Sequence, residues 1–139
     1  MKKTMQNFIK NSNIDAKLIR AVVRQSGGWV AFQEMAHDIV NHGIAGGFSG
    51  WIYYTETCQF YAKNQSTIVA LVDEWADECD ISPISFVGGF NCIDANDIQT
   101  IGKTLYGNKR QHDTQVANAL AWFAAEEVAC SFVNWMEQC

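Results

Sequence analysis

Apolar residues recur at intervals of three and four through nearly the whole chain, and this spacing constrains the fold more than any other feature. Such intervals place apolar side chains on one face of an α-helix, whereas a half-buried strand requires strict alternation. The chain has a single proline, Pro83, so little interrupts the helical pattern between its glycine-rich breaks. The aromatic run at 51–54 could be briefly extended, but one strand cannot build a sheet. We therefore predict an all-α fold, a single compact domain of about six or seven helices over residues 1–139.

The breaks in the apolar pattern indicate where each helix begins and ends. Asn13, Ser82 and Asn96 can cap helix N-termini because their side-chain oxygens accept hydrogen bonds from free backbone N–H groups. Gly43 falls where the end of a helix favours a residue with positive φ. The start, about residues 1–12, precedes the first predicted helix and can be flexible. The predicted helices span about 13–25, 28–42, 55 or 57 to 63, 65 or 66 to 79, 83–88, 96–107 and 113–136.

Within these segments the apolar side chains predict which face of each helix is buried. The expected core faces are Trp29, Phe32, Ala36, Ile39 and Val40; Ile68, Leu71, Val72, Trp75 and Cys79; Ile98, Ile101 and Leu105; and Leu120, Ala124, Val128, Phe132 and Trp135. Hydrophobic residues make up 48% of the chain. This is enough apolar material for a full core, which argues against a disordered chain.

The composition is typical of a soluble, cytoplasmic protein. No apolar run approaches the roughly 18–20 residues that a membrane-spanning helix needs. The lysines near the start are not followed by the apolar segment of a signal peptide. The five cysteines form no C-x-x-C pair, and we interpret them as reduced thiols that pack as small apolar side chains.

Charge is distributed unevenly along the chain. Residues 1–25 contain six of the ten lysines and arginines but one acid, Asp15. Between Lys63 and Lys103 there is no basic residue, and seven acids fall in that interval. An acidic body of this kind repels nucleic acid and attracts basic protein surfaces. Direct binding of nucleic acid is therefore not expected, although the basic start could contact phosphates.

The motifs of catalytic and metal sites are incomplete. Glu34 and His37 have the E-x-x-H spacing of di-iron helical bundles, but no second E-x-x-H accompanies Glu126 or Glu127. His37 and His42 are five residues apart, so a helix would not direct them at one metal ion. No phosphate-binding glycine motif occurs, and no cysteine lies in a nucleophile motif. We expect no catalytic residue, no metal and no cofactor.

The acidic stretch is the main candidate for a functional surface. It contains Asp73, Glu74, Asp77, Glu78 and Asp80, within one predicted helix and just beyond its end. Carboxylates on one helical face can imitate the phosphates of nucleic acid and so occupy a basic groove. The alternative is a charged face that only keeps the protein in solution.

A second candidate surface is aromatic. Trp51, Tyr53 and Tyr54 follow a glycine-rich segment, and aromatic side chains are typical anchors of protein interfaces. The two candidate surfaces predict different results. If acidic mimicry mediates binding, lysine in place of Asp73, Glu74, Asp77 and Glu78 abolishes it, and salt weakens it. If aromatic contact mediates binding, substitution of Trp51, Tyr53 or Tyr54 weakens it instead.

Two segments resemble a family of small tailed-phage and prophage proteins of unknown function. Residues 27–54 follow the pattern G-G-W-x-x-F-x-E-x-A-x-D-I-x-N-H-G-x-x-G-G-F-x-G-x-I-Y-Y. The segment A-L-A-W-F-A-A-E-E-V-A at 119–129 is similar to that family's closing helix. The resemblance brings no catalytic residues. It implies a phage protein that acts in the cytoplasm of an infected bacterium.

Small acidic phage proteins that are not enzymes often block host defence complexes, as anti-CRISPR proteins do. The resemblance therefore implies an inhibitor whose partner is a host protein or ribonucleoprotein defence complex with a basic surface. One alternative is a phage accessory protein that redirects host replication or transcription. A further alternative is a metal-dependent enzyme built around Glu34 and His37.

Overall fold

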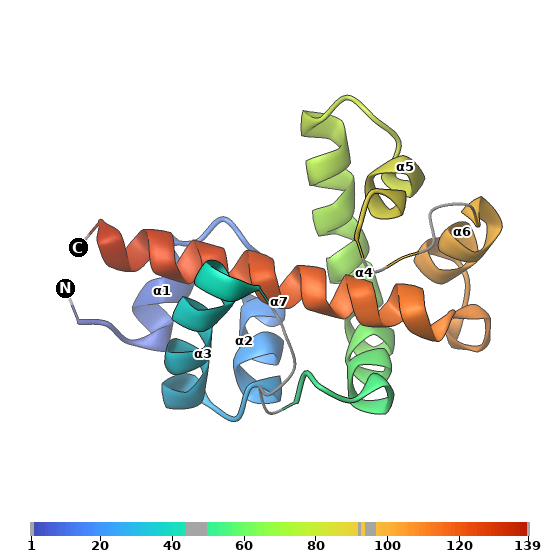
Figure 1. The fold of residues 1–139 in the computed structure, drawn as a ribbon. Helices are drawn as coiled ribbons and strands as arrows, with labels where there is room; N and C mark the ends of the chain where they lie inside the picture. The colour runs from blue at the N-terminus through green and yellow to red at the C-terminus, as the bar shows by residue number, and fades with distance from the viewer. Residues whose placement is uncertain (1, 44–49, 92, 94–96, 139) are drawn as a thin grey trace. The chain divides into compact units, whose positions relative to one another are not determined.

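The computed structural model describes residues 2–43, 50–91, 93 and 97–138, and every regular element among them is helical (Figure 1). The prediction of an all-α fold with six or seven helices is confirmed, since this part of the chain contains seven α-helices and one 3₁₀ helix. They are α1 (Met5–Asn11), α2 (Ala16–Gln25), α3 (Trp29–His42), α4 (Tyr54–Glu78), α5 (Pro83–Gly88), α6 (Ile98–Tyr106), η1 (Lys109–Gln111) and α7 (Thr114–Glu137).

Residue contacts group the chain into two compact units. The terminal unit contains residues up to Tyr53 and from Trp122 onward, hence α1, α2, α3 and the greater part of α7. The central unit, Tyr54–Ala121, contains α4, α5, α6, η1 and the first two turns of α7. Each unit has its own set of buried apolar side chains.

An aromatic cluster forms the core of the terminal unit. Phe8 of α1, Trp29 and Phe32 of α3, and Phe132 and Trp135 of α7 are in ring contact, with centroids 5.3–6.4 Å apart. Edge-to-face and offset pairs at these distances add to the stabilisation from apolar burial. Figure 1 shows α1 and α3 beside the C-terminal part of α7, with which their rings are in contact.

The start of the chain contains a helix that the sequence did not predict. Met5–Asn11 form α1, and the Oγ1 of Thr4 accepts a hydrogen bond from the Asn7 N–H at 3.2 Å to cap it. Phe8 is 0% exposed. A helix of seven residues is not stable alone, so burial of this one ring explains why the segment folds.

α2 begins at a different cap from the predicted one. The carboxylate of Asp15, not the side chain of Asn13, accepts a hydrogen bond from a first-turn N–H, that of Lys17 at 2.8 Å. Both residue types are good caps. The negative charge of Asp15 also interacts favourably with the partial positive charge of a helix N-terminus, which favours it over the neutral side chain.

α3 matches its predicted bounds, and Gly43 ends it as expected. Gly43 has φ 73°, and its N–H donates to the Ile39 carbonyl at 2.7 Å. The predicted core face is partly wrong, since Val40 is 41% exposed whereas Met35 is buried. Residues 44–49 lie outside the described part of the chain. The aromatic run at 51–54, which could have been briefly extended, is not a strand: Trp51 and Ile52 lie in a turn and a bend, and Tyr54 begins α4.

α4 contains the break that the sequence predicts between two helices, but as a kink within one element. Asn64 has non-helical dihedral angles of φ −119° and ψ 19°, and its Nδ2 donates to the Phe60 carbonyl at 2.9 Å. Asparagine side chains compete for backbone groups in this way. Beyond the kink the predicted core face is wrong at two positions, since Trp75 is 37% exposed and Cys79 is exposed, whereas Ala76 is buried.

The short helices of the central unit confirm one predicted cap and replace another. The Oγ of Ser82 accepts from the Ser85 N–H at 3.1 Å, with Pro83 in the first turn of α5. Asp97 caps α6 through the Thr100 N–H at 3.0 Å. The hydrogen bonds from Thr100 lower the pKa of the Asp97 carboxyl. The predicted cap Asn96 lies outside the described residues, and Ile98, predicted to be buried, is 64% exposed.

The C-terminal end of α6 is held by side chains of α4. The Tyr61 hydroxyl donates to the Thr104 carbonyl at 2.7 Å, and the Gln65 amide donates to the carbonyls of Leu105 at 3.0 Å and Gly107 at 2.9 Å. The last carbonyls of a helix have no partner within the helix. Burial raises the pKa of the Tyr61 hydroxyl, which stays protonated and able to donate.

Gln65→Met is expected to lower the free energy of unfolding by about 1–3 kcal/mol, because two carbonyls lose a donor while the side-chain volume is kept. Urea unfolding followed by circular dichroism measures the change. Gln59→Met, at an exposed position of the same helix, is the control and should change stability little. Equal urea midpoints for the two variants would contradict the capping role of Gln65.

α7 has the core face that its spacing predicts. Leu120, Ala124, Val128, Phe132 and Trp135 are each at most 5% exposed. By length and composition alone α7 could cross a membrane, which corrects the expectation that no apolar segment is long enough. Of the apolar window that meets this criterion, 67% is buried by the rest of the chain. A helix at the core of a folded protein meets the same criterion, and the burial favours that interpretation.

Candidate functional site

The five predicted acidic residues lie at the surface together, at the C-terminal end of α4 and in the turn after it. Asp73, Glu74, Asp77, Glu78 and Asp80 are all exposed, and we call them the acidic surface. The last turn of α4 contains no basic residue. Carboxylates there interact unfavourably with the partial negative charge of the helix C-terminus. Each pair of like charges four residues apart also destabilises the helix by a few tenths of a kcal/mol.

The turn that ends α4 places Asp80 in a conformation that favours glycine. Asp80 has φ 56°, and its N–H donates to the Asp77 carbonyl at 3.1 Å, while the Ile81 N–H donates to the Ala76 carbonyl at 3.1 Å. This pair of bonds defines a Schellman turn. The end of α2 has the same pair of bonds, with Gly27 at φ 104° in the equivalent position. Asp80 therefore occupies the position that Gly27 occupies in the turn after α2.

Asp80→Gly is expected to raise the free energy of unfolding by about 0.5–1 kcal/mol, because glycine adopts positive φ without steric cost and the change removes a charge from the helix C-terminus. Thermal or urea unfolding measures the gain. Asp80→Ala is the matched control, since it removes the same charge but keeps a Cβ. Asp80→Ala should be less stable than Asp80→Gly, and the reverse order would contradict the strained turn.

Exposed apolar side chains accompany the acids. Trp75 is 37% exposed, Ile81 is 46% exposed and Tyr106 of α6 is 59% exposed. Partial burial and the negative charge of Asp73 raise the pKa of the Tyr106 hydroxyl, so this ring lies near the acidic surface. Aromatic and aliphatic groups beside charges suit contact with a protein. The exposed Ile81 and Tyr106 were not predicted from sequence. The sequence did contain a signal for Tyr106, because the spacing of Ile101 and Leu105 predicts a buried face that does not include it.

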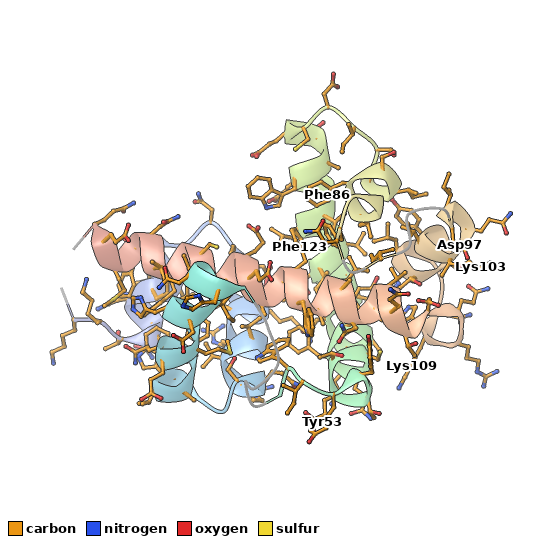
Figure 2. The ribbon with its side chains drawn as sticks, in the orientation of Figure 1. Tyr53, Phe86, Asp97, Lys103, Lys109 and Phe123 are labelled. Carbon is orange, nitrogen blue, oxygen red and sulfur yellow. The ribbon has the colours of Figure 1, made fainter. Side chains whose placement is uncertain are left out.

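One of the three predicted aromatic contacts is buried. Trp51 is 1% exposed, its Nε1 donates to the Ser26 hydroxyl at 3.0 Å, and its carbonyl accepts from Trp122 Nε1 at 2.9 Å. It belongs to the core of the terminal unit, which corrects its assignment to a binding surface. Tyr53 and Tyr54 are 62% and 57% exposed, as a contact surface requires. Figure 2 labels Tyr53, whose side chain projects from the segment just before α4.

Within the described residues, no group of three or more His, Cys, Asp or Glu side chains could hold a metal ion. Glu34, His37 and His42 are exposed, and the His37 ring contacts Phe132 with centroids 6.2 Å apart. His37 therefore covers the edge of the aromatic cluster.

The cysteines are less buried than a set of small apolar core residues would be. Cys79 and Cys130 are exposed and Cys58 is half-buried, all three as free thiols. Burial and nearby carboxylates, Asp113 for Cys58 and Glu127 with Glu126 for Cys130, raise the pKa of both thiols. A raised thiol pKa disfavours the nucleophilic thiolate. Cys92 and Cys139 lie outside the described residues.

Comparisons with known proteins give a family and no function. Neither the curated proteins nor the solved structures contain a match to this chain. One family model, described as a domain of unknown function (DUF7222), matches residues 2–138. Because this match covers nearly the whole chain, the protein belongs to the DUF7222 family.

Proposed function

We propose that this protein is a phage-encoded, non-enzymatic inhibitor that binds a bacterial defence complex of the kind that anti-CRISPR proteins block. The acidic surface would occupy a basic groove that otherwise holds nucleic acid, in the cytoplasm of the infected bacterium. The observation that carries the proposal is the exposure of all five predicted carboxylates on one end of α4 and its turn.

The geometry of the helix supports mimicry of a charged polymer. Side chains four residues apart on a helix have Cβ atoms about 5–6 Å apart. Asp73 with Asp77 and Glu74 with Glu78 therefore form two short rows of negative charge, and Asp80 extends them into the turn. Basic grooves attract such a surface at long range and bind it through several charges at once. Trp75 and Ile81 would add apolar contact beside these rows.

The stability cost of the acidic surface supports a role in binding rather than in solubility alone. A solubilising acid can lie anywhere on the surface, and helix N-termini favour it. Here four carboxylates, Asp73, Glu74, Asp77 and Glu78, occupy the last two turns of α4, and Asp80 occupies a position that favours glycine. Charges placed where they oppose folding are typical of functional sites.

The test is affinity capture from bacteria that contain defined defence systems, followed by phage challenge. The wild-type protein should capture a subunit of one system and restore phage growth. Replacing Glu74, Asp77 and Glu78 with lysine should weaken capture about tenfold or more, because the new charges repel a basic groove. Wild-type binding should also weaken as salt rises from about 0.1 to 1 M.

The control for these changes is the replacement of Glu34, Asp38 and Glu137, three exposed acids of the terminal unit, with lysine. It alters net charge equally but leaves the acidic surface intact, so capture should persist. Loss of capture in both variants would indicate a general charge effect. Capture of polymerase or replisome subunits in place of a defence subunit would favour an accessory protein and contradict the inhibitor.

A further inference from the structure

The central unit has a shallow groove of about 530 Å³ along the exposed side of α4. Its walls include Lys63, Ser66, Val69, Ala70 and Asp73 of α4 together with Leu105 of α6. The groove shares only Asp73 with the acidic surface. A molecule bound in this groove would therefore be distinct from the partner proposed for the acidic surface.

The groove has opposite charges near its two ends. Lys63 and Asp73 are both exposed and line the groove ten residues apart, on the two sides of the kink at Asn64. Between them the α4 wall has Gln65, whose amide is bonded to the end of α6, and the short side chains of Ser66, Val69 and Ala70. Short side chains let a second helix approach closely.

This order of charges is complementary to itself. Under a two-fold rotation that packs α4 of one copy antiparallel to α4 of another, the Lys63 end of each meets the Asp73 end of the other. The midpoint of the pattern falls between the exposed residues Ser66 and Ala70, so the two copies would cross at their smallest side chains. An interface of this type uses the same patch on both copies and closes as a dimer.

We propose that a second copy of this chain occupies the groove and that the protein forms a two-fold dimer through antiparallel contact of α4 with α4. Two symmetric ion pairs join Lys63 of each copy to Asp73 of the other, and the apolar contact comes from Val69, Ala70 and Leu105. Glu74, Asp77, Glu78 and Asp80 do not line the groove. The dimer would thus present two copies of most of the acidic surface.

The test is sedimentation of the full chain over a range of concentrations. Wild type should reach a dimer, and Lys63→Asp and Asp73→Lys should each raise the dimer Kd about tenfold or more, because each variant turns two attractive pairs into repulsive ones. An equimolar mixture of the two variants should dimerise again. In the mixed dimer the introduced aspartate faces the introduced lysine, and the unchanged Asp73 of one chain faces the unchanged Lys63 of the other.

Two further variants separate this interface from other causes. Ala70→Arg places a long side chain at the crossing point and should prevent dimerisation, whereas Glu34→Lys in the terminal unit should not. A wild-type protein that stays monomeric at high micromolar concentration would overturn the proposal. So would a dimer that Lys63→Asp and Ala70→Arg leave unchanged, or variants that fail to associate when mixed. Lys63→Asp and Ala70→Arg leave the acidic surface intact, so their outcome is independent of capture by a defence complex.

Discussion

Phe132→Ala is expected to lower the free energy of unfolding by about 3–5 kcal/mol, because it leaves a cavity at the centre of the aromatic cluster. The Phe132 ring is 0% exposed and lies 5.5 Å from Phe8, 5.3 Å from Trp29 and 5.4 Å from Phe32 between centroids. Its removal therefore weakens the contact of α7 with both α1 and α3. Urea unfolding followed by tryptophan fluorescence measures the loss.

Two companion variants show whether the cavity is the cause. Phe132→Leu keeps most of the volume and should cost clearly less than Phe132→Ala, since the cost grows with the cavity that remains. Val30→Ala removes apolar atoms from a side chain that is 68% exposed and should change stability little. If Phe132→Ala and Val30→Ala unfold at the same urea concentration, the cluster is not the core of the terminal unit.

Trp51→Ala is expected to destabilise the fold by a similar amount, about 3–5 kcal/mol. The indole is almost wholly buried, and its Nε1 donates to the hydroxyl of Ser26, which is also buried. Trp51→Phe keeps most of the apolar contact and loses the hydrogen bond, so a smaller loss of about 1–2 kcal/mol is expected. Unfolding in urea distinguishes the two variants.

Tyr53→Ala is the matched comparison for Trp51, because Tyr53 is two residues away and 62% exposed. It should leave the free energy of unfolding nearly unchanged. If Trp51→Ala were as harmless as Tyr53→Ala but reduced capture of a partner, Trp51 would be a surface anchor, as the sequence first indicated. The burial of Trp51 predicts the opposite result.

Local signals in the sequence predicted several features of the fold correctly. Ser82 followed by Pro83 marks the start of α5, and Gly43 ends α3 with positive φ. The predicted break near residue 64 is the kink at Asn64. Each of these depends on one residue and its immediate backbone, so no knowledge of distant contacts is needed.

The errors lie where neighbouring elements decide the outcome. Val40, Trp75 and Ile98 continue apolar stripes at the correct spacing, yet all three are more than a third exposed. Helical spacing predicts the direction in which a side chain points, but not whether another helix covers it. Phe8 shows the converse, because it lies in a mostly polar segment where no helix was predicted, yet it is fully buried.

Some features of the candidate site were likewise predictable from the sequence, and others were not. Exposure of the acids was predictable, since unpaired carboxylates are rarely buried. The positive φ of Asp80, the approach of Tyr106 to Asp73 and the groove between Lys63 and Asp73 were not predictable. The φ of Asp80 depends on the local turn after α4, which no glycine marks in the sequence. The other two features depend on the packing of α6 against α4, which joins residues far apart in the chain.

The sequence by itself determined that the chain is helical, where most helices end and which stretch is acidic, because these follow from spacing, caps and charge within a few residues. The tertiary structure alone decided that Trp51 is part of the core, that Met5–Asn11 fold onto the aromatic cluster and that Gln65 and Tyr61 hold the end of α6. Burial and capping between distant residues depend on which surfaces meet, and local spacing carries no information about that.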